Sequence, residues 1–242
     1  MNRKVLAVVF IVTLLALCVE TTSVHAQADQ VTIFPSDDTY VISQNPDSNY
    51  GGQTYLEVVT TSLNRSTVLL KFNLSSIPVG AVVDNVTFQL YTTFVSEPWY
   101  RIGVTHLTSN SWNESTLTYN GYQSLDGGIY LESIDFSVYI MSSNQWYSWN
   151  QTTSINLAKD DASYTEITLV LLTGELFQPN SYIWFASKEN SAAYSPRLIV
   201  HWRGIVPEFP AVALFSTFVT VTSLIAVFYR RKNKKLSFAQ EA

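Results

Sequence analysis

The stretch Asn85-Val86-Thr87-Phe88-Gln89-Leu90 decides the fold. Its apolar side chains, Val86, Phe88 and Leu90, alternate with polar ones. Successive side chains of a strand point to opposite faces, so this alternation predicts a β-strand with one face in a core and the other in water. An earlier stretch, Thr67-Val68-Leu69-Leu70-Lys71-Phe72, is apolar at positions 68, 70 and 72 and predicts a second half-buried strand.

Further strands are predicted outward from these two, separated by turns rich in Gly, Pro, Asn and Asp. Only residues 153–159 show a short helical pattern, and the chain has no alternation of strands and helices of the kind that predicts a parallel sheet. About ten short strands favour a jelly roll over a seven-stranded immunoglobulin-like sandwich. We therefore predict an all-β fold, a two-sheet antiparallel β-sandwich that is jelly-roll-like. The further strands are expected at residues 31–34, 39–43, 55–60, 100–107, 166–172, 182–188 and 197–202.

The N-terminal end has the pattern of a secretory signal peptide. Arg3 and Lys4 precede an apolar run over residues 5–19, and small residues around Ala26 and Ala28 suit a cleavage site. We predict a signal peptide at residues 1–28. An uncleaved anchor is the alternative, and a lipoprotein anchor at Cys18 is disfavoured because the large Leu17 precedes it.

The C-terminal end predicts a membrane anchor. A breaker-rich linker, residues 204–210, leads into the uncharged apolar stretch 211–229 and then into a basic tail, residues 230–242. Nineteen helical residues rise about 30 Å, the thickness of the hydrocarbon core, and a basic run is retained on the cytoplasmic side. We expect a single-pass protein of the cell membrane, with residues 29–203 outside as the ectodomain.

Composition limits the function of that ectodomain. Its stretch contains no cysteine, so disulfides cannot stabilise it. Residues 27–206 hold nine Asp and seven Glu against seven Lys and Arg, a net charge of −9, whereas the basic chain ends bring the whole chain to −5. That sign disfavours a nucleic-acid partner. Five glycosylation sequons fall in the same stretch, either through composition or because the surface is glycosylated: Asn64, Asn73, Asn85, Asn113 and Asn150.

Catalytic residues are hard to find. The ectodomain has two histidines, His106 and His201, both inside predicted strands, and no cysteine nucleophile. Two carboxylate pairs, Asp37-Asp38 and Asp160-Asp161, are adjacent in sequence. Neighbouring residues of a strand point to opposite faces, so neither pair predicts an acid and a nucleophile on one substrate. The sequence predicts a protein that is not an enzyme.

A calcium site is a more favourable prediction. Calcium binds six to eight oxygen atoms from carboxylates, amides and carbonyls. Such groups crowd the turns between the first strands, and the sandwich could bring a late glutamate close to them. The alternative is that Asp and Asn here only form turns. The predicted ligands are Asp37, Asp38, Asp47, Asn49 and Glu189.

Sugar binding would depend on exposed aromatic rings, whose faces stack on pyranose rings while nearby polar groups bind the hydroxyls. Rings near predicted loops or strand ends are the candidates, although a sandwich rich in aromatics buries most of them. Trp112, Trp184 and Trp202 are expected in the core. The predicted carbohydrate-binding residues are Trp99, Tyr100, Tyr122, Trp146 and Trp149, with Tyr147 and Tyr194 in the wider set.

Several motifs together resemble a known module. They are residues 37–41, 45–52, 56–58, 70–78, 80–81, 86–91, 111–120, 186–189 and 195–198, in this order within residues 31–202. Together they resemble the DNRLRE domain, also classed as carbohydrate-binding module family 96 and related to repeats of archaeal disaggregatases. The resemblance implies a module that binds extracellular or cell-envelope polysaccharide without catalysis. The alternatives are a structural or adhesive surface protein and, third, an enzyme that degrades matrix polysaccharide.

The tail carries a separate resemblance. Pro207-Glu208-Phe209-Pro210, an apolar helix and a basic end are similar to the PEF-type C-terminal sorting signal of archaeal surface proteins. That resemblance implies processing of the anchor by an archaeosortase-like enzyme. A plain retained anchor is the alternative.

Overall fold

The computed structural model of this 242-residue chain describes residues 28–61, 64–98, 100–125, 135–160, 165–173 and 181–203, with Thr222, Ile225 and Ala226. Residues Ala26–Gly204 form one compact unit. The predicted signal peptide, apart from Ala28, and nearly all of the predicted membrane segment lie outside the described residues. Within the described residues, no helix has the length and apolarity needed to cross a membrane.

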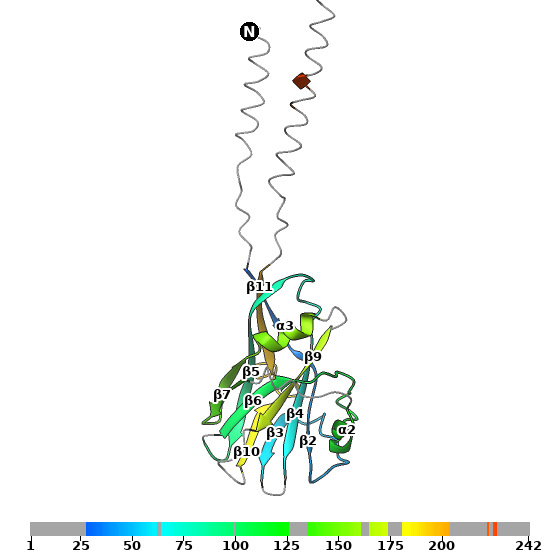
Figure 1. Cartoon of the computed structure of the whole chain (residues 1–242). Helices are drawn as coiled ribbons and strands as arrows, with labels where there is room; N and C mark the ends of the chain where they lie inside the picture. Colours follow the sequence, from blue (N-terminus) through cyan, green and yellow to red (C-terminus); the bar gives the residue numbers. More distant parts are fainter. Residues whose placement is uncertain are drawn as a thin grey trace, which may run out of the picture. The chain divides into compact units, whose positions relative to one another are not determined.

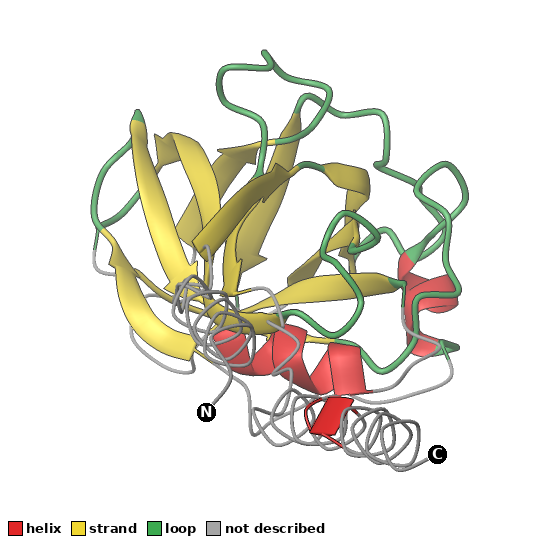
Figure 2. Cartoon of the chain, turned by 90° about the horizontal axis from the view of Figure 1, so that it is seen from above, coloured by secondary structure: helices red, strands yellow, loops and turns green. Residues whose placement is uncertain are grey.

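The compact unit is built from two antiparallel sheets, as predicted (Figures 1 and 2). All connections except β6 to β7 and β10 to β11 pass from one sheet to the other. The two-sheet sandwich is therefore confirmed, while its jelly-roll subclass stays a prediction. Sheet A contains β1 (Ala28–Ile33), β3 (Tyr55–Thr60), β5 (Val82–Val95), β8 (Gln145–Asn150), β10 (Ser181–Ala186) and β11 (Arg197–Arg203). Sheet B contains β2 (Pro35–Ile42), β4 (Ser66–Asn73), β6 (Tyr100–His106), β7 (Asp135–Ile140) and β9 (Glu166–Thr173).

The long strand β5 organises sheet A. Its residues 87–89 pair with both β8 and β11, so these two strands flank it on opposite sides. Thr92 pairs with both β8 and β10, so β10 lies on the same side of β5 as β11, farther along the strand. Strand β11 is itself paired with β1, and Ala28 lies opposite Arg203. The two ends of the domain therefore lie side by side.

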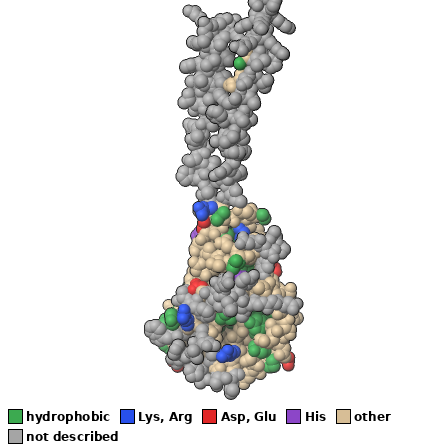
Figure 3. Space-filling view, viewed as in Figure 1, with side chains coloured by type: hydrophobic (Ala, Val, Ile, Leu, Met, Phe, Trp, Pro, Cys, Tyr) green, Lys and Arg blue, Asp and Glu red, His purple; other side chains and the backbone are tan. Residues whose placement is uncertain are grey.

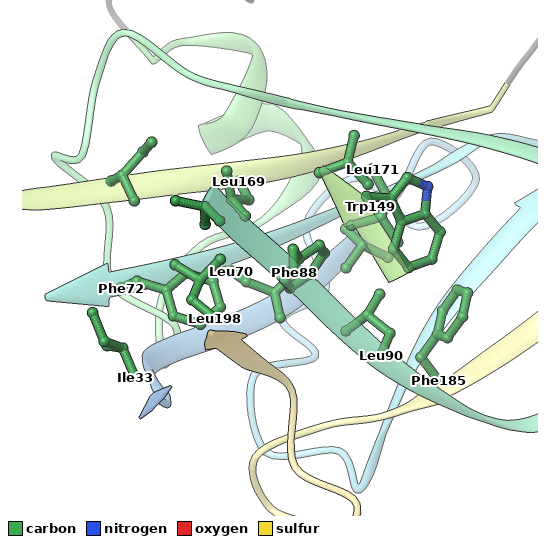
Figure 4. Close-up of a cluster of buried hydrophobic side chains, with 14 of the residues drawn as sticks. Ile33, Leu70, Phe72, Phe88, Leu90, Trp149, Leu169, Leu171, Phe185 and Leu198 are labelled. Carbon is green, nitrogen blue, oxygen red and sulfur yellow. The ribbon is translucent and has the colours of Figure 1, made fainter. Parts of the chain in front are cut away.

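The core between the sheets confirms the alternation in β5. Val86, Phe88 and Leu90 are completely buried. Phe88 meets the ring of Phe72 edge-on, with 5.9 Å between centroids, and contacts Trp149 on its other side (Figure 4). Phe72 comes from β4 of sheet B, whereas Phe88 and Trp149 come from β5 and β8 of sheet A, so their contacts hold the two sheets together.

The strand predicted at residues 67–72 is confirmed by β4, but the prediction that it is only half-buried is wrong. Leu69 is 0% and Lys71 only 6% exposed, although both point away from the main core. The chain that follows β6 folds over this face of sheet B and forms a second apolar cluster that includes Trp112. The Lys71 ammonium donates to the Trp112 carbonyl at 2.5 Å and lies 3.6 Å from the carboxylate of Asp37. A strand covered on both sides cannot be recognised from its own alternation.

The helical prediction for residues 153–159 is confirmed by α3 (Thr152–Asp160). A second short helix, α2 (Tyr119–Gln123), begins after Thr118, whose hydroxyl accepts from the backbone N–H of Gly121. Helix α2 and strands β7 and β8 were not predicted. They lie in the part of the sequence where strand and turn signals are weakest.

Candidate functional site

The outer face of sheet A carries a group of aromatic side chains around Tyr194. We call Tyr91, Trp146, Tyr194 and Arg197 the Tyr194 group. Tyr91 stacks on Tyr194, with 4.2 Å between ring centroids and 20° between planes. The Trp146 ring meets Tyr91 edge-on at 5.4 Å, and the Arg197 guanidinium lies 4.1 Å from the Trp146 centroid. The group thus spans β8, β5 and β11, since Arg197 reaches across the central strand.

Hydrogen bonds from neighbouring polar side chains hold Arg197 of this group in position. Arg197 Nε donates to Gln89 Oε1 at 2.9 Å, and Gln89 Nε2 donates to Ser148 Oγ at 3.0 Å. Burial and the neighbouring Tyr194 raise the pKa of Tyr91, so its hydroxyl stays neutral. Tyr194 itself is 40% exposed. The face therefore offers an exposed ring next to a cation, an amide and hydroxyls.

A β-bulge adds a second aromatic group to the same face. The register between β5 and β10 shifts so that Trp184 lies opposite Phe94, while the next residue, Phe185, lies opposite Thr92. The extra residue turns Phe94 outward, where its ring lies 4.9 Å from that of Trp184. Phe94 is 39% exposed and Trp184 is partly buried. The expectation that Trp184 belongs to the core is wrong, whereas Trp112 and Trp202 are buried as predicted.

The structure places the predicted carbohydrate-binding residues in different environments. Trp146 is in the Tyr194 group. Trp149 is wrong as a binding residue, because it is 1% exposed and its indole N–H donates to the Ile102 carbonyl at 2.9 Å. Tyr122 is part of α2 and packs against the second apolar cluster, where burial raises its pKa. Trp99 and the side chain of Tyr100 lie outside the described residues, although the Tyr100 backbone begins β6.

The structure brings only two of the five predicted metal ligands together. Asp38 and Glu189 come together with Glu114, which was not predicted, and their carboxylate oxygens lie within 4.8 Å of one another. Asp37 lies near Lys71 instead, and Asp47 accepts from the Asn120 amide at 2.7 Å.

The predicted ligand Asn49 is engaged elsewhere. Its amide nitrogen donates to the carbonyls of Glu114 and Leu117, at 2.6 and 2.8 Å, and its oxygen accepts from the Gly51 N–H. Asn49 thereby positions the segment that bears Glu114.

The three carboxylates, Asp38, Glu114 and Glu189, form the acidic cluster. Its one ion-pair partner among the described residues is Lys188, whose ammonium lies 2.9 Å from Glu114 Oε1 and 2.5 Å from Glu189 Oε1. Burial raises the pKa of Asp38 to about 8, and the charge of Glu189 adds to this, although the Lys188 backbone N–H lowers it. In the absence of a cation, a proton shared between Asp38 and Glu189 can relieve the repulsion between their two carboxylates.

Four of the five sequon asparagines are exposed, and Asn64 is partly buried. Asn85 and Asn150 lie on the outer face of sheet A, since both are exposed and take part in the strand pairing of β5. Charged side chains on the face shown in Figure 3 are scattered among neutral atoms. Over that face Lys and Arg form no continuous patch among the described residues.

A hollow of about 560 Å³ lies elsewhere, over the second apolar cluster, between Asn110, Trp112, Asn113 and Gly121. Trp112 is buried there and its indole N–H already donates to Thr168 Oγ1 at 2.8 Å. Among the described residues that line it, this hollow therefore presents no exposed aromatic face to a sugar.

Comparison with known proteins identifies the family of this chain. A search of curated proteins finds no match. The family model described as carbohydrate-binding module family 96 matches residues 29–201, from the second residue of β1 to within β11. The matched residues cover more than half of the chain. The chain belongs to carbohydrate-binding module family 96.

Proposed function

We propose that this protein is a non-catalytic carbohydrate-binding module of the cell surface that binds extracellular or cell-envelope polysaccharide through the Tyr194 group. The observation that carries this proposal is the exposed ring of Tyr194, held flat by its stack on Tyr91 at 4.2 Å. A ring that is already fixed loses little conformational freedom when a pyranose stacks on it. Family membership supports the ligand class.

Polar groups beside the rings suit the hydroxyls of a sugar. Arg197 and Gln89 present donors next to Trp146, and Ser148 presents a hydroxyl at the edge. Their mutual hydrogen bonds set their positions before a ligand arrives. The Phe94 and Trp184 rings on the same face supply a further stacking surface for a longer chain.

Affinity electrophoresis of the full-length chain in detergent, through gels that contain neutral, uronic-acid or envelope polysaccharides, tests this proposal. We expect retardation by at least one polysaccharide, and about a tenfold loss of affinity in Tyr194→Ala, since one stacked ring contributes on the order of 1 kcal/mol or more. Retardation by none of these polymers, from a folded protein, would favour the structural or adhesive alternative.

A matched control variant lies on the other sheet. Tyr139 is an exposed ring with an arginine, Arg101, 5.8 Å from its centroid, much as Trp146 has Arg197. Tyr139→Ala should bind polysaccharide as the parent chain does. Equal losses in Tyr139→Ala and Tyr194→Ala would show that binding depends on general aromatic exposure and would contradict this site.

The absence of catalysis is supported by the position of the carboxylates. Glycoside hydrolysis needs two carboxyl groups on either side of the scissile bond. In the acidic cluster Asp38 is 1% exposed, so a glycosidic bond cannot approach it. We expect no new reducing ends when the protein is incubated with a polysaccharide that it binds.

The chain ends suit display at the cell surface. A signal peptide at residues 1–28 would export residues 29–203, and residues 211–229 would hold them at the cell membrane. The Pro207-Glu208-Phe209-Pro210 motif suits a PEF-type signal read by an archaeosortase-like enzyme. Deleting residues 205–242 should move the protein from the membrane fraction to the medium. Mass spectrometry of the mature C-terminus would separate a processed anchor from a retained one.

A further inference from the structure

We propose that the acidic cluster of Asp38, Glu114 and Glu189 is a calcium site. The site goes beyond sugar binding and stands whether or not a polysaccharide binds. It joins three segments that are far apart in sequence: β2, the segment before α2, and the loop between β10 and β11.

Two carboxylate oxygens of the cluster are placed to bind a cation. Asp38 Oδ1 and Glu189 Oε2 are both buried, and neither has a hydrogen-bond partner among the described residues. Asp38 is 1% exposed as a whole residue and faces the other two carboxylates. Buried polar atoms without a partner are rare because each costs free energy, so an unpaired carboxylate oxygen aimed at two other carboxylates indicates a cation.

The remaining oxygens of the cluster are already used, which leaves these two free. Asp38 Oδ2 accepts from the Lys188 backbone N–H at 2.7 Å, and Glu114 Oε2 accepts from the Asp38 backbone N–H at 3.0 Å. These bonds hold the carboxylates in place without an ion. The site is therefore organised before a cation binds.

Size and charge favour calcium. Calcium binds oxygen at about 2.3–2.6 Å, so two of its ligands lie at most about 5 Å apart. The cluster oxygens, within 4.8 Å of one another, meet this condition. Three carboxylates and one lysine leave a charge of −2 when all are ionised, which one divalent cation would neutralise. Magnesium is less suitable, because it requires a more regular octahedron and keeps its waters.

Lys188 does not block the site. Its ammonium contacts Glu114 Oε1 and Glu189 Oε1, which are not the two unpaired oxygens. Its side chain is 24% exposed, as are those of Glu114 and Glu189 to a similar extent, so an ion can enter from that side while water completes its coordination.

Calcium binding to the full-length chain in detergent tests this site, after EDTA treatment and removal of the chelator. We expect one calcium ion per chain by isothermal titration calorimetry. At a calcium concentration 100-fold above Kd, the Tm should rise by about 5 to 10 °C, whereas magnesium at the same concentration should have a much smaller effect.

Two substitutions locate the ion. Glu189→Gln keeps the size of the side chain and should lower calcium affinity at least tenfold, while circular dichroism shows that the chain is folded. Asp47→Asn is the matched control, because Asp47 lies outside the acidic cluster and bonds Asn120 instead. No binding at millimolar calcium by the folded parent chain, or unchanged binding in Glu189→Gln, would overturn the proposal, and so would loss of binding in Asp47→Asn.

Discussion

Replacing Trp149 by phenylalanine separates the core from the binding face, because the other tryptophan of β8, Trp146, lies on the outward face of the same strand. Trp149→Phe removes the buried hydrogen bond to the Ile102 carbonyl, which costs about 1–3 kcal/mol, and leaves part of the indole volume empty beside Phe88 and Phe185. Together we expect a loss of about 2–4 kcal/mol, or about 5–15 °C in Tm for a domain of this size.

The assay is thermal unfolding of the full-length chain, followed by far-UV circular dichroism and paired with affinity electrophoresis at 20 °C or below. Trp149→Phe should unfold early yet bind polysaccharide normally when folded. Trp146→Ala should lose affinity while its Tm changes by only a few degrees, since an exposed cation–π contact contributes about 0.5–1 kcal/mol. Weakened binding by folded Trp149→Phe, with an unchanged Tm, would refute the assignment of Trp149 to the core.

Three further results are expected. Gly51→Ala should destabilise the chain by about 1–3 kcal/mol, because a Cβ there would lie 2.2 Å from the Glu114 carbonyl oxygen, whereas Gly52→Ala, with nothing within 4 Å, should be neutral in the same thermal assay. Burial lowers the pKa of His106 to about 4, whereas in the unfolded chain it is about 6.5, so below pH 6.5 the unfolded state binds more protons than the folded state. Between pH 6.5 and 4 the parent chain should therefore lose roughly 2 kcal/mol of stability relative to His106→Gln. Parallel curves of stability against pH for the two chains would contradict this. Glycopeptide mass spectrometry should find the four exposed sequons more fully occupied than Asn64, whose amide oxygen accepts from Ser43 and Gln44, and equal occupancy would exclude accessibility as the cause.

The strands that alternate cleanly were predictable from sequence because their pattern is local. Over residues 85–90 of β5, each inward residue is apolar and each neighbour polar, so this part of the strand shows its own core face. Strand β8 gives no such signal, because Trp146, Tyr147 and Trp149 are aromatic on both faces. Only its register with β5, which places Trp146 beside Tyr91, decides that Trp146 points outward while Trp149 enters the core.

The candidate sites were predictable only in part, because both depend on contacts between distant segments. Asp38 and Glu189 were expected near each other, because the N-terminal and C-terminal parts of a sandwich often lie side by side. Glu114 could not be expected there, because its position depends on how the segment after β6 folds back over sheet B. The outward turn of Phe94 likewise depends on a bulge that appears only when β5 pairs with β10.

The pairing of β1 with β11 has a mechanical consequence. Because Ala28 lies opposite Arg203, a pull on the C-terminal end enters the domain along β11, which is hydrogen-bonded to β1 on one side and β5 on the other. If a bound polymer holds the outer face of sheet A, the load runs parallel to these ladders and stresses many hydrogen bonds at once in shear. A tethered domain of this geometry should therefore withstand tension better than one pulled apart bond by bond.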